Sequence, residues 1–125
     1  MYPAAQVIAL ARPHGCKVMT KARFPGADGI HYSAADLMRL AQRPPESLAA
    51  ASCHDRPELE RAMSLGLDFA VLGPVKKTAS HPGAAALGWE KFTTLAAGSM
   101  LPVYAIGGLM PSDLDRARRA GAHGL

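Results

Sequence analysis

The sequence predicts an α/β fold in which parallel strands alternate with helices. Three segments begin with glycine and lead into an apolar run: Gly26-Ala-Asp-Gly-Ile30, Gly66-Leu-Asp-Phe-Ala70 and Gly121-Ala-His-Gly-Leu125. Glycine suits the end of a helix, and the short apolar run that follows suits a strand. Repeated helix–glycine–strand units imply a parallel sheet, because parallel strands need crossover connections.

The elements that we expect follow the chain in a regular order. The helices are expected over residues 4–13, 34–42, 55–65, 88–97 and 112–120, and the strands over 17–20, 28–32, 48–52, 68–72 and 102–106. A sixth strand is expected to begin at the C-terminal end of the sequence.

The helix over 55–65 carries the clearest start and stop signals. Asp55 and Glu58 have the spacing of a capping box, Pro57 stands in the first turn, and Gly66 ends the helix. Ser33 and Asp36 give a similar start to the helix before it. In the helix over 88–97, one side is apolar and faces the expected core; it carries Trp89, Phe92 and Leu95.

Composition favours one globular domain that binds anions. The chain has 125 residues, of which 49% are hydrophobic and 19% are charged, so it can bury a core. The net charge of +4 favours anionic partners, but no basic run is interleaved with aromatic residues as in many nucleic-acid binders. Small phosphorylated molecules are therefore the expected ligands, with no nucleic acid as partner.

The sequence contains few features that indicate a cellular compartment. Cys16 and Cys53 have no CxxC spacing, so neither a disulfide framework nor a zinc site is indicated. No signal peptide or membrane-spanning run is visible, and we expect a cytoplasmic protein without a membrane partner.

The segment Pro102-Val-Tyr-Ala-Ile-Gly-Gly108 is the strongest candidate for ligand binding. A short apolar strand leads into Gly107 and Gly108 and then into a helix. Two glycines let the backbone approach a ligand closely, and late strand-to-helix loops of α/β barrels commonly bind phosphate. These glycines could also relieve crowding between a strand and a helix.

The chain is too short for a complete barrel. A barrel of eight βα units needs about 250 residues, and too few residues separate the strands over 17–20 and 28–32 for a crossover helix. We therefore expect a partial (β/α)8 TIM barrel, from a truncated or internally deleted chain.

Four motifs resemble the superfamily of thiamine phosphate synthase and TenI-type thiazole tautomerase. They are Ala51-Ser-Cys-His-Asp55, Asp68-Phe-Ala-Val-Leu-Gly-Pro-Val-Lys-Lys-Thr-Ala-Ser-His-Pro-Gly83, Pro102–Gly108 and Ala120-Gly-Ala-His-Gly124. Upstream, Ala27–His31 and Ser33–Leu37 look like the fourth strand of the family and its loop. The resemblance covers about residues 26–125 and implies a single barrel fragment over 1–125, with strands 3 to 8 and the last one cut short. The His-Pro-Gly variant and Trp89 look most like versions fused to Nudix hydrolases.

The resemblance implies a thiamine phosphate synthase of thiamine biosynthesis, a transferase. It would couple hydroxymethylpyrimidine diphosphate to thiazole phosphate, release pyrophosphate and use Mg²⁺. Residues matching the family's substrate and phosphate contacts are Ser52, Lys77, Thr78, Ser80, Gly107 and Gly108. Asp36 matches a metal-binding aspartate, although it also suits a helix cap.

Other features of the sequence depart from the family. The first two strands, which hold pyrimidine and diphosphate, have no counterpart. Where the family places Asn-Asp after its third strand, with the aspartate a metal ligand, this chain has Met19-Thr-Lys-Ala22. His81 replaces the loop lysine, and Lys76 and Lys77 stand earlier. Whether this chain is an active enzyme is therefore left open.

Two alternative functions are kept. His54 matches the histidine that moves protons in the TenI-type tautomerases, and imidazole suits proton transfer near neutral pH. The second alternative is a non-catalytic phosphate-binding module, the remnant of a Nudix hydrolase fusion. Cys53, His31 and His123 are expected to be structural, and unpaired strand edges are expected to favour self-association.

Overall fold

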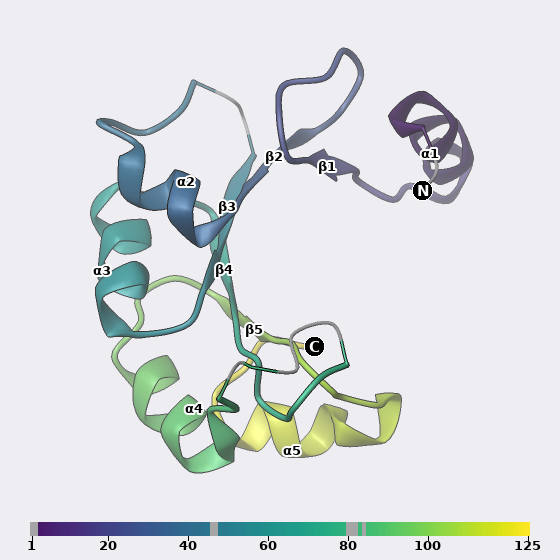
Figure 1. The fold of residues 1–125 in the computed structure, drawn as a ribbon. Helices are drawn as coiled ribbons and strands as arrows, with labels where there is room; N and C mark the ends of the chain where they lie inside the picture. Colours follow the sequence, from purple (N-terminus) through teal and green to yellow (C-terminus); the bar gives the residue numbers. More distant parts are fainter. Residues whose placement is uncertain (1–2, 46–47, 80–82, 84) are drawn as a thin grey trace.

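The structure, a computed structural model, describes residues 3–45, 48–79, 83 and 85–125. One parallel sheet has the order β1-β2-β3-β4-β5. Its strands are β1 (Met19–Thr20), β2 (Gly29–Tyr32), β3 (Ala49–Cys53), β4 (Phe69–Leu72) and β5 (Val103–Ala105). The predicted α/β class is confirmed, and the five strands leave the sheet open instead of closing it into a barrel (Figure 1).

Helices cover one face of this sheet. They are α1 (Ala4–Ala11), α2 (Ala34–Arg39), α3 (Arg56–Ser64), α4 (Gly88–Ala97) and α5 (Leu114–Arg119), with short 3-10 turns at η1 (Arg12–His14) and η2 (Pro111–Asp113). In Figure 1, α2 to α5 follow the same side of the sheet, and α1 lies apart from them beyond β1. None of the helices in the described ranges combines the length and hydrophobicity that a membrane span needs.

Several element boundaries differ from the prediction. Helix α2 ends at Arg39 and not at residue 42, because Leu40 turns to an extended backbone with ψ of 130°. The strand predicted over 17–20 forms only at Met19–Thr20, and both end helices carry a 3-10 turn. As expected, no helix separates the parallel strands β1 and β2. At the other edge, Gly124 makes a single parallel bridge to Tyr104, where the sixth strand was expected.

The three glycine-initiated segments make the same turn. Gly26, Gly66 and Gly121 all have positive φ, at 88°, 68° and 99°, a conformation that glycine adopts without steric cost. Two residues later, the N–H groups of Asp28, Asp68 and His123 each donate to a carbonyl at the start of the neighbouring strand, over 2.8 Å. Gly66 and Gly121 follow a helix, whereas Gly26 follows the loop after β1.

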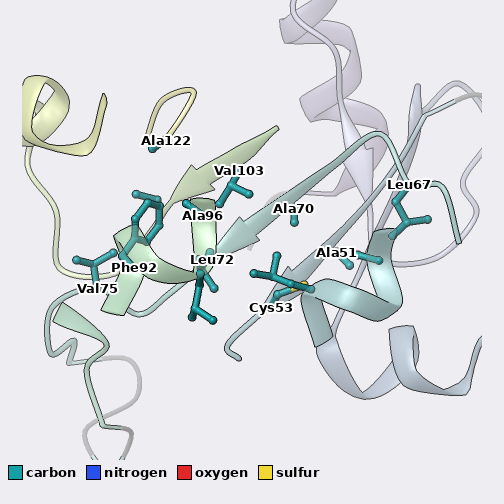
Figure 2. Packing of buried hydrophobic residues seen from close by; sticks show 14 of the residues in the cluster. Ala51, Cys53, Leu67, Ala70, Leu72, Val75, Phe92, Ala96, Val103 and Ala122 are labelled. Atoms are coloured by element: carbon teal, nitrogen blue, oxygen red, sulfur yellow. The ribbon is translucent and has the colours of Figure 1, made fainter. Parts of the chain in front are cut away.

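The hydrophobic core lies between the sheet and α2 to α5. Strand residues that point toward the helices are almost fully buried, and Phe92 of α4 is 0% exposed among them. Figure 2 shows Phe92, Leu72 and Val103 packed from α4, β4 and β5. Trp89 packs edge-to-face on Phe92 with 5.8 Å between ring centroids, so the predicted apolar side of α4 is confirmed. This packing fixes the strand ends that carry the candidate site.

Candidate functional site

A cavity of about 390 Å³ lies where β3, β4 and β5 end. The carboxyl ends of parallel strands meet at one edge of a sheet, which is where α/β enzymes bind ligands. Five of the residues predicted to bind or react border this cavity, namely Ser52, His54, Thr78, Gly107 and Gly108. The structure therefore brings together side chains and loops that are up to 56 positions apart in the sequence.

Ser52 enters the cavity from β3, and its hydroxyl is tied to the neighbouring strand. Ser52 Oγ lies 2.8 Å from Nε2 of His31, a half-buried residue of β2. Burial lowers the pKa of His31 below 6.5, and the nearby Lys21 ammonium lowers it further. At neutral pH the imidazole is therefore uncharged.

His54 lies at the end of β3, at the rim of the cavity. Its Nδ1 is 3.2 Å and 3.3 Å from the two carboxylate oxygens of Glu58, four residues later in the first turn of α3. An acceptor at Nδ1 favours a proton on that nitrogen and leaves Nε2 available as a base. The side chain is 53% exposed, so a ligand in the cavity could reach it.

Cys53, between these two residues, points the other way. It is 1% exposed and belongs to the core in Figure 2. Burial raises the pKa of its thiol to about 12, with further contributions from Glu58 and Asp55. A thiol with this pKa carries almost no thiolate at neutral pH, which supports the prediction of a structural cysteine.

Gly107 and Gly108 form the opposite wall, pressed against the loop after β4. Their φ angles are 106° and 66°. A Cβ atom on Gly107 would lie 2.5 Å from Pro74 Cα, and one on Gly108 would lie 2.8 Å from the carbonyl oxygen of Lys77. The backbones are also joined by hydrogen bonds from Val75 N–H to Ile106 and from Lys76 N–H to Gly107. Packing against the loop after β4 thus requires both glycines, whereas the alternative drawn from the sequence was crowding between a strand and a helix.

The same loop presents backbone donors that are not used within the protein. In the part of the chain that the structure describes, the N–H groups of Gly107, Gly108 and Leu109 donate no hydrogen bond. Successive backbone N–H groups with positive φ nearby can form a concave anion-binding nest. The glycines therefore meet two demands, close loop packing and free donors beside the cavity.

The lysines after β4 have different surroundings. Lys76 Nζ is 3.2 Å from Oδ1 of Asp113, so it joins this loop to the turn before α5. Hydrogen bonds from the Met110 N–H and from Lys76 lower the pKa of Asp113. Lys77 is exposed and does not border the cavity. Ser80 and His81 lie outside the described residues.

Asp36 lies in the first turn of α2. Its N–H donates to Ser33 Oγ over 3.1 Å, which confirms Ser33 as the helix cap, and its carboxylate is 3.5 Å from Arg39. Among the described residues, no group of at least three His, Cys, Asp or Glu side chains could hold a metal ion. Mg²⁺ is commonly held by one or two carboxylates together with substrate phosphates and water, so the metal role of Asp36 stays a prediction.

Apolar cavity residues were missed by the sequence analysis. Val71, Pro74 and Ile106 complete the cavity wall. Val71 and Tyr104 are paired in register, so both point away from the helices. For Val71, the alternation of side chains along the strand is the signal that could have identified it, since strand residues that do not face the helices face the other side of the sheet.

Comparisons with known proteins agree on one family. The model of a family described as thiamine monophosphate synthase matches residues 4–125, which extends the resemblance by more than 20 residues toward the N-terminus. A thiamine-phosphate synthase of Thermosynechococcus vestitus is 32% identical over 127 residues, covering 95% of this chain and 36% of the relative. One of Thermus thermophilus is 34% identical over 125 residues, covering 94% of this chain and 60% of the relative.

A solved structure shows the same fold. Thiamine phosphate pyrophosphorylase from Pyrococcus furiosus superposes with a TM-score of 0.71 at 19% sequence identity, covering 98% of this chain and 65% of that chain. The chain thus spans from about a third to three fifths of the length of the two sequence relatives named above.

Proposed function

The chain belongs to the thiamine monophosphate synthase family, and on that premise we propose that its cavity is the thiazole-phosphate side of a thiamine-phosphate synthase site. The observation that carries this proposal is the row of free N–H groups at Gly107, Gly108 and Leu109 beside a cavity that Ser52 and Thr78 also border. Backbone donors bind a phosphate without a counter-charge, and the apolar wall suits a thiazole ring.

In the reaction that we propose, the thiazole nitrogen attacks the methylene carbon of hydroxymethylpyrimidine diphosphate. A carbon–nitrogen bond forms, and the carbon–oxygen bond to the diphosphate breaks with its electrons leaving on pyrophosphate. The contribution of this chain is to hold the thiazole phosphate by its phosphate end, so that the ring nitrogen stays within reach of the second substrate. The Ser52 hydroxyl would contact the departing pyrophosphate. Synthases of this family generally depend on Mg²⁺, which would stabilise the charge of the departing pyrophosphate when bound.

Binding and turnover should be tested separately. Thiazole phosphate should shift the amide resonances of Gly107, Gly108 and Leu109 in an NMR titration, and both substrates together should yield thiamine phosphate. Thr78→Val should weaken binding, whereas Thr93→Val on the outer side of α4 is the matched control. Unchanged amide resonances at saturating ligand would contradict the proposed site.

A tautomerase activity is the second candidate, because His54 and Glu58 form a pair at the rim of this cavity. In that reaction His54 Nε2 would move a proton on a thiazole carboxylate phosphate, with Glu58 holding Nδ1. His54→Gln should then abolish aromatisation while phosphate binding persists. Full tautomerase activity in this variant would eliminate the candidate.

We also propose that the uncovered face of the sheet binds a second copy of this chain. Phe69, Val71, Tyr104, Ile106 and Leu125 border a cavity of about 320 Å³ there. The accessible surface of 7711 Å² exceeds the value of about 6,400 Å² expected for a compact protein of 13.1 kDa. This excess is of the order that one partner buries in a stable interface, about 800 Å².

A further inference from the structure

The loop after β4 and the loop after β5 lie against each other beyond the ends of their strands. The Val75 N–H donates to the carbonyl of Ile106 over 2.9 Å, and the Lys76 N–H donates to the carbonyl of Gly107 over 3.0 Å. These backbone contacts fix the position of Gly107, where the row of free N–H groups begins. The far end of the row, toward η2, is held by side chains instead.

Asp113 holds that far end. Its Oδ2 accepts a hydrogen bond from the Met110 N–H over 2.8 Å, and its own N–H donates to the Met110 carbonyl, also over 2.8 Å. The two bonds close the turn directly after Leu109 and use the Met110 N–H, so among the described residues the row of free donors ends at Leu109. The same carboxylate places a negative charge next to donors that would bind an anion, and like charges at this range repel.

Lys76 compensates that charge. Its Nζ lies 3.2 Å and 3.3 Å from the two carboxylate oxygens of Asp113. The Asp113 side chain is only 18% exposed, so water reaches a small part of it. The pKa of Asp113 is lowered, first by the Met110 N–H and then by Lys76, and the carboxylate is therefore ionised at neutral pH. The ion pair also ties the loop after β4 to the turn that ends the donor row.

We propose that Asp113 and Lys76 form a charge-compensated clamp that positions the N–H donors of Gly107 to Leu109. Asp113 closes the turn at the end of the row, and Lys76 cancels the charge that this carboxylate would otherwise direct at a bound anion. Both are positioning residues, since neither borders the cavity. The clamp rests on the proposed function in that these donors bind a phosphate, and it deepens that function by naming the side chains that suit the row to an anion.

The first test separates the two roles of Asp113. Asp113→Asn keeps an oxygen that can accept from the Met110 N–H but removes the charge, so it should bind inorganic phosphate at least as tightly as the wild type. Asp113→Ala removes both, and it should weaken binding about fivefold, the effect of losing a cap of ordinary strength. Equal phosphate affinity in folded Asp113→Ala and in the wild type would contradict the clamp.

Amide hydrogen exchange at Met110 tests the same cap without any ligand. Protection of this N–H should persist in Asp113→Asn and be lost in Asp113→Ala, because only the first variant keeps an acceptor for it. Equal protection in both variants would show that Asp113 does not hold the turn.

The second test is a double-mutant cycle on the ion pair, read by titration of the chain with inorganic phosphate. Lys76→Ala leaves the carboxylate uncompensated, so it should weaken binding about tenfold. Adding Asp113→Asn should return the affinity to within about threefold of the wild type, because the charge that needed compensation is gone. A lysine that only tied the loops together, or that itself bound the anion, would leave the double variant as weak as Lys76→Ala. Lys91→Ala, which removes the same charge from an exposed position of α4, is the matched control.

Two probes keep the clamp separate from the proposed function. Inorganic phosphate reports on the donor row alone, through the amide resonances of Gly107 to Leu109, and thiazole phosphate reports on the whole cavity. If thiazole phosphate binds no better than inorganic phosphate while the double variant shows rescue, the clamp stands and the proposed ligand is wrong. If thiazole phosphate binds tightly but its affinity is unchanged in folded Lys76→Ala, the clamp is wrong and the ligand stands. Amide resonances that neither probe shifts would overturn both.

Discussion

At the scale of single residues, Gly107 shows how one position can serve both structure and binding. Its positive φ and its distance to Pro74 leave no room for a side chain, while its own N–H remains free. A loss of ligand binding in a bulky variant would therefore not identify a phosphate contact. The stability of the variants has to be measured first.

We expect Gly107→Ala to destabilise the fold by about 3 kcal/mol or more, because backbone strain and overpacking both contribute. Gly66→Ala, also at positive φ but with open space around the new methyl group, should cost only the strain of about 1–2 kcal/mol. Gly83→Ala, which meets no atom within 4 Å, should be nearly neutral. Urea denaturation gives the three values, and equal costs for Gly107→Ala and Gly66→Ala would contradict the packing argument.

His31 makes stability depend on pH in a defined direction. Its pKa is lowered in the folded protein, so on acidification the unfolded chain takes up the proton first, at about pH 6.5. Stability should therefore fall as the pH decreases from about 6.5 until the folded pKa is passed. In His31→Gln this part of the pH dependence should be missing, and exposed His14→Gln serves as the control. Parallel pH profiles of wild type and His31→Gln would contradict the assignment.

At the scale of elements, the helix that follows β3 places His54 and Glu58. Helix α3 begins after Asp55, whose Oδ1 accepts from the Glu58 N–H over 3.0 Å. The cap therefore holds the first turn, and with it the Glu58 carboxylate beside His54. Local sequence signals thus act directly on the geometry of the candidate site.

Asp55→Ala should destabilise the protein by about 1 kcal/mol, the usual cost of losing a helix N-cap. Glu60→Ala, at an exposed position of the same helix, should change stability by less than about 0.5 kcal/mol. Thermal denaturation followed by circular dichroism measures both. If the two variants are equally stable, the cap contributes nothing to the fold.

At the scale of the whole molecule, the open sheet is the feature with the largest consequence. Helices cover one face of the sheet (Figure 1). On the opposite face, the half-buried rings of Phe69 and Tyr104 pack edge-to-face at 5.3 Å, beside exposed Ile106 and Leu125. Exposed apolar patches of this kind mark interaction surfaces or aggregation-prone surfaces. Among the described residues, the outer strand β1 is a further edge that pairs on one side only.

Light scattering should accordingly give a mass about twice the 13.1 kDa of the chain, in a concentration-dependent manner. Leu125→Glu places a charge on the uncovered face and should shift the equilibrium toward monomer. Leu10→Glu makes the same change of side chain at an exposed position of α1, away from this face, and should leave the mass unchanged. If the wild-type chain is monomeric at all concentrations, the proposal that this face binds a second copy is wrong.

The sequence determined most of the architecture, because its strongest signals are local. Asp55 with Glu58 marks the start of α3, and the three glycine-initiated segments mark the turns at positive φ. The motifs with a family resemblance also predicted Ser52, His54, Thr78 and the glycine pair, which the fold brings to one cavity. Such signals need only neighbouring residues, so they can be recognised without the fold.

Other features were decided only by the tertiary structure. The Lys76–Asp113 ion pair, the His31–Ser52 contact and the approach of Gly107 to Pro74 join residues 37, 21 and 33 positions apart. Pairings over such separations depend on strand register and loop packing, which many sequences can satisfy in different ways. The sequence by itself therefore determined the α/β order and the candidate residues, and the tertiary structure decided their partners.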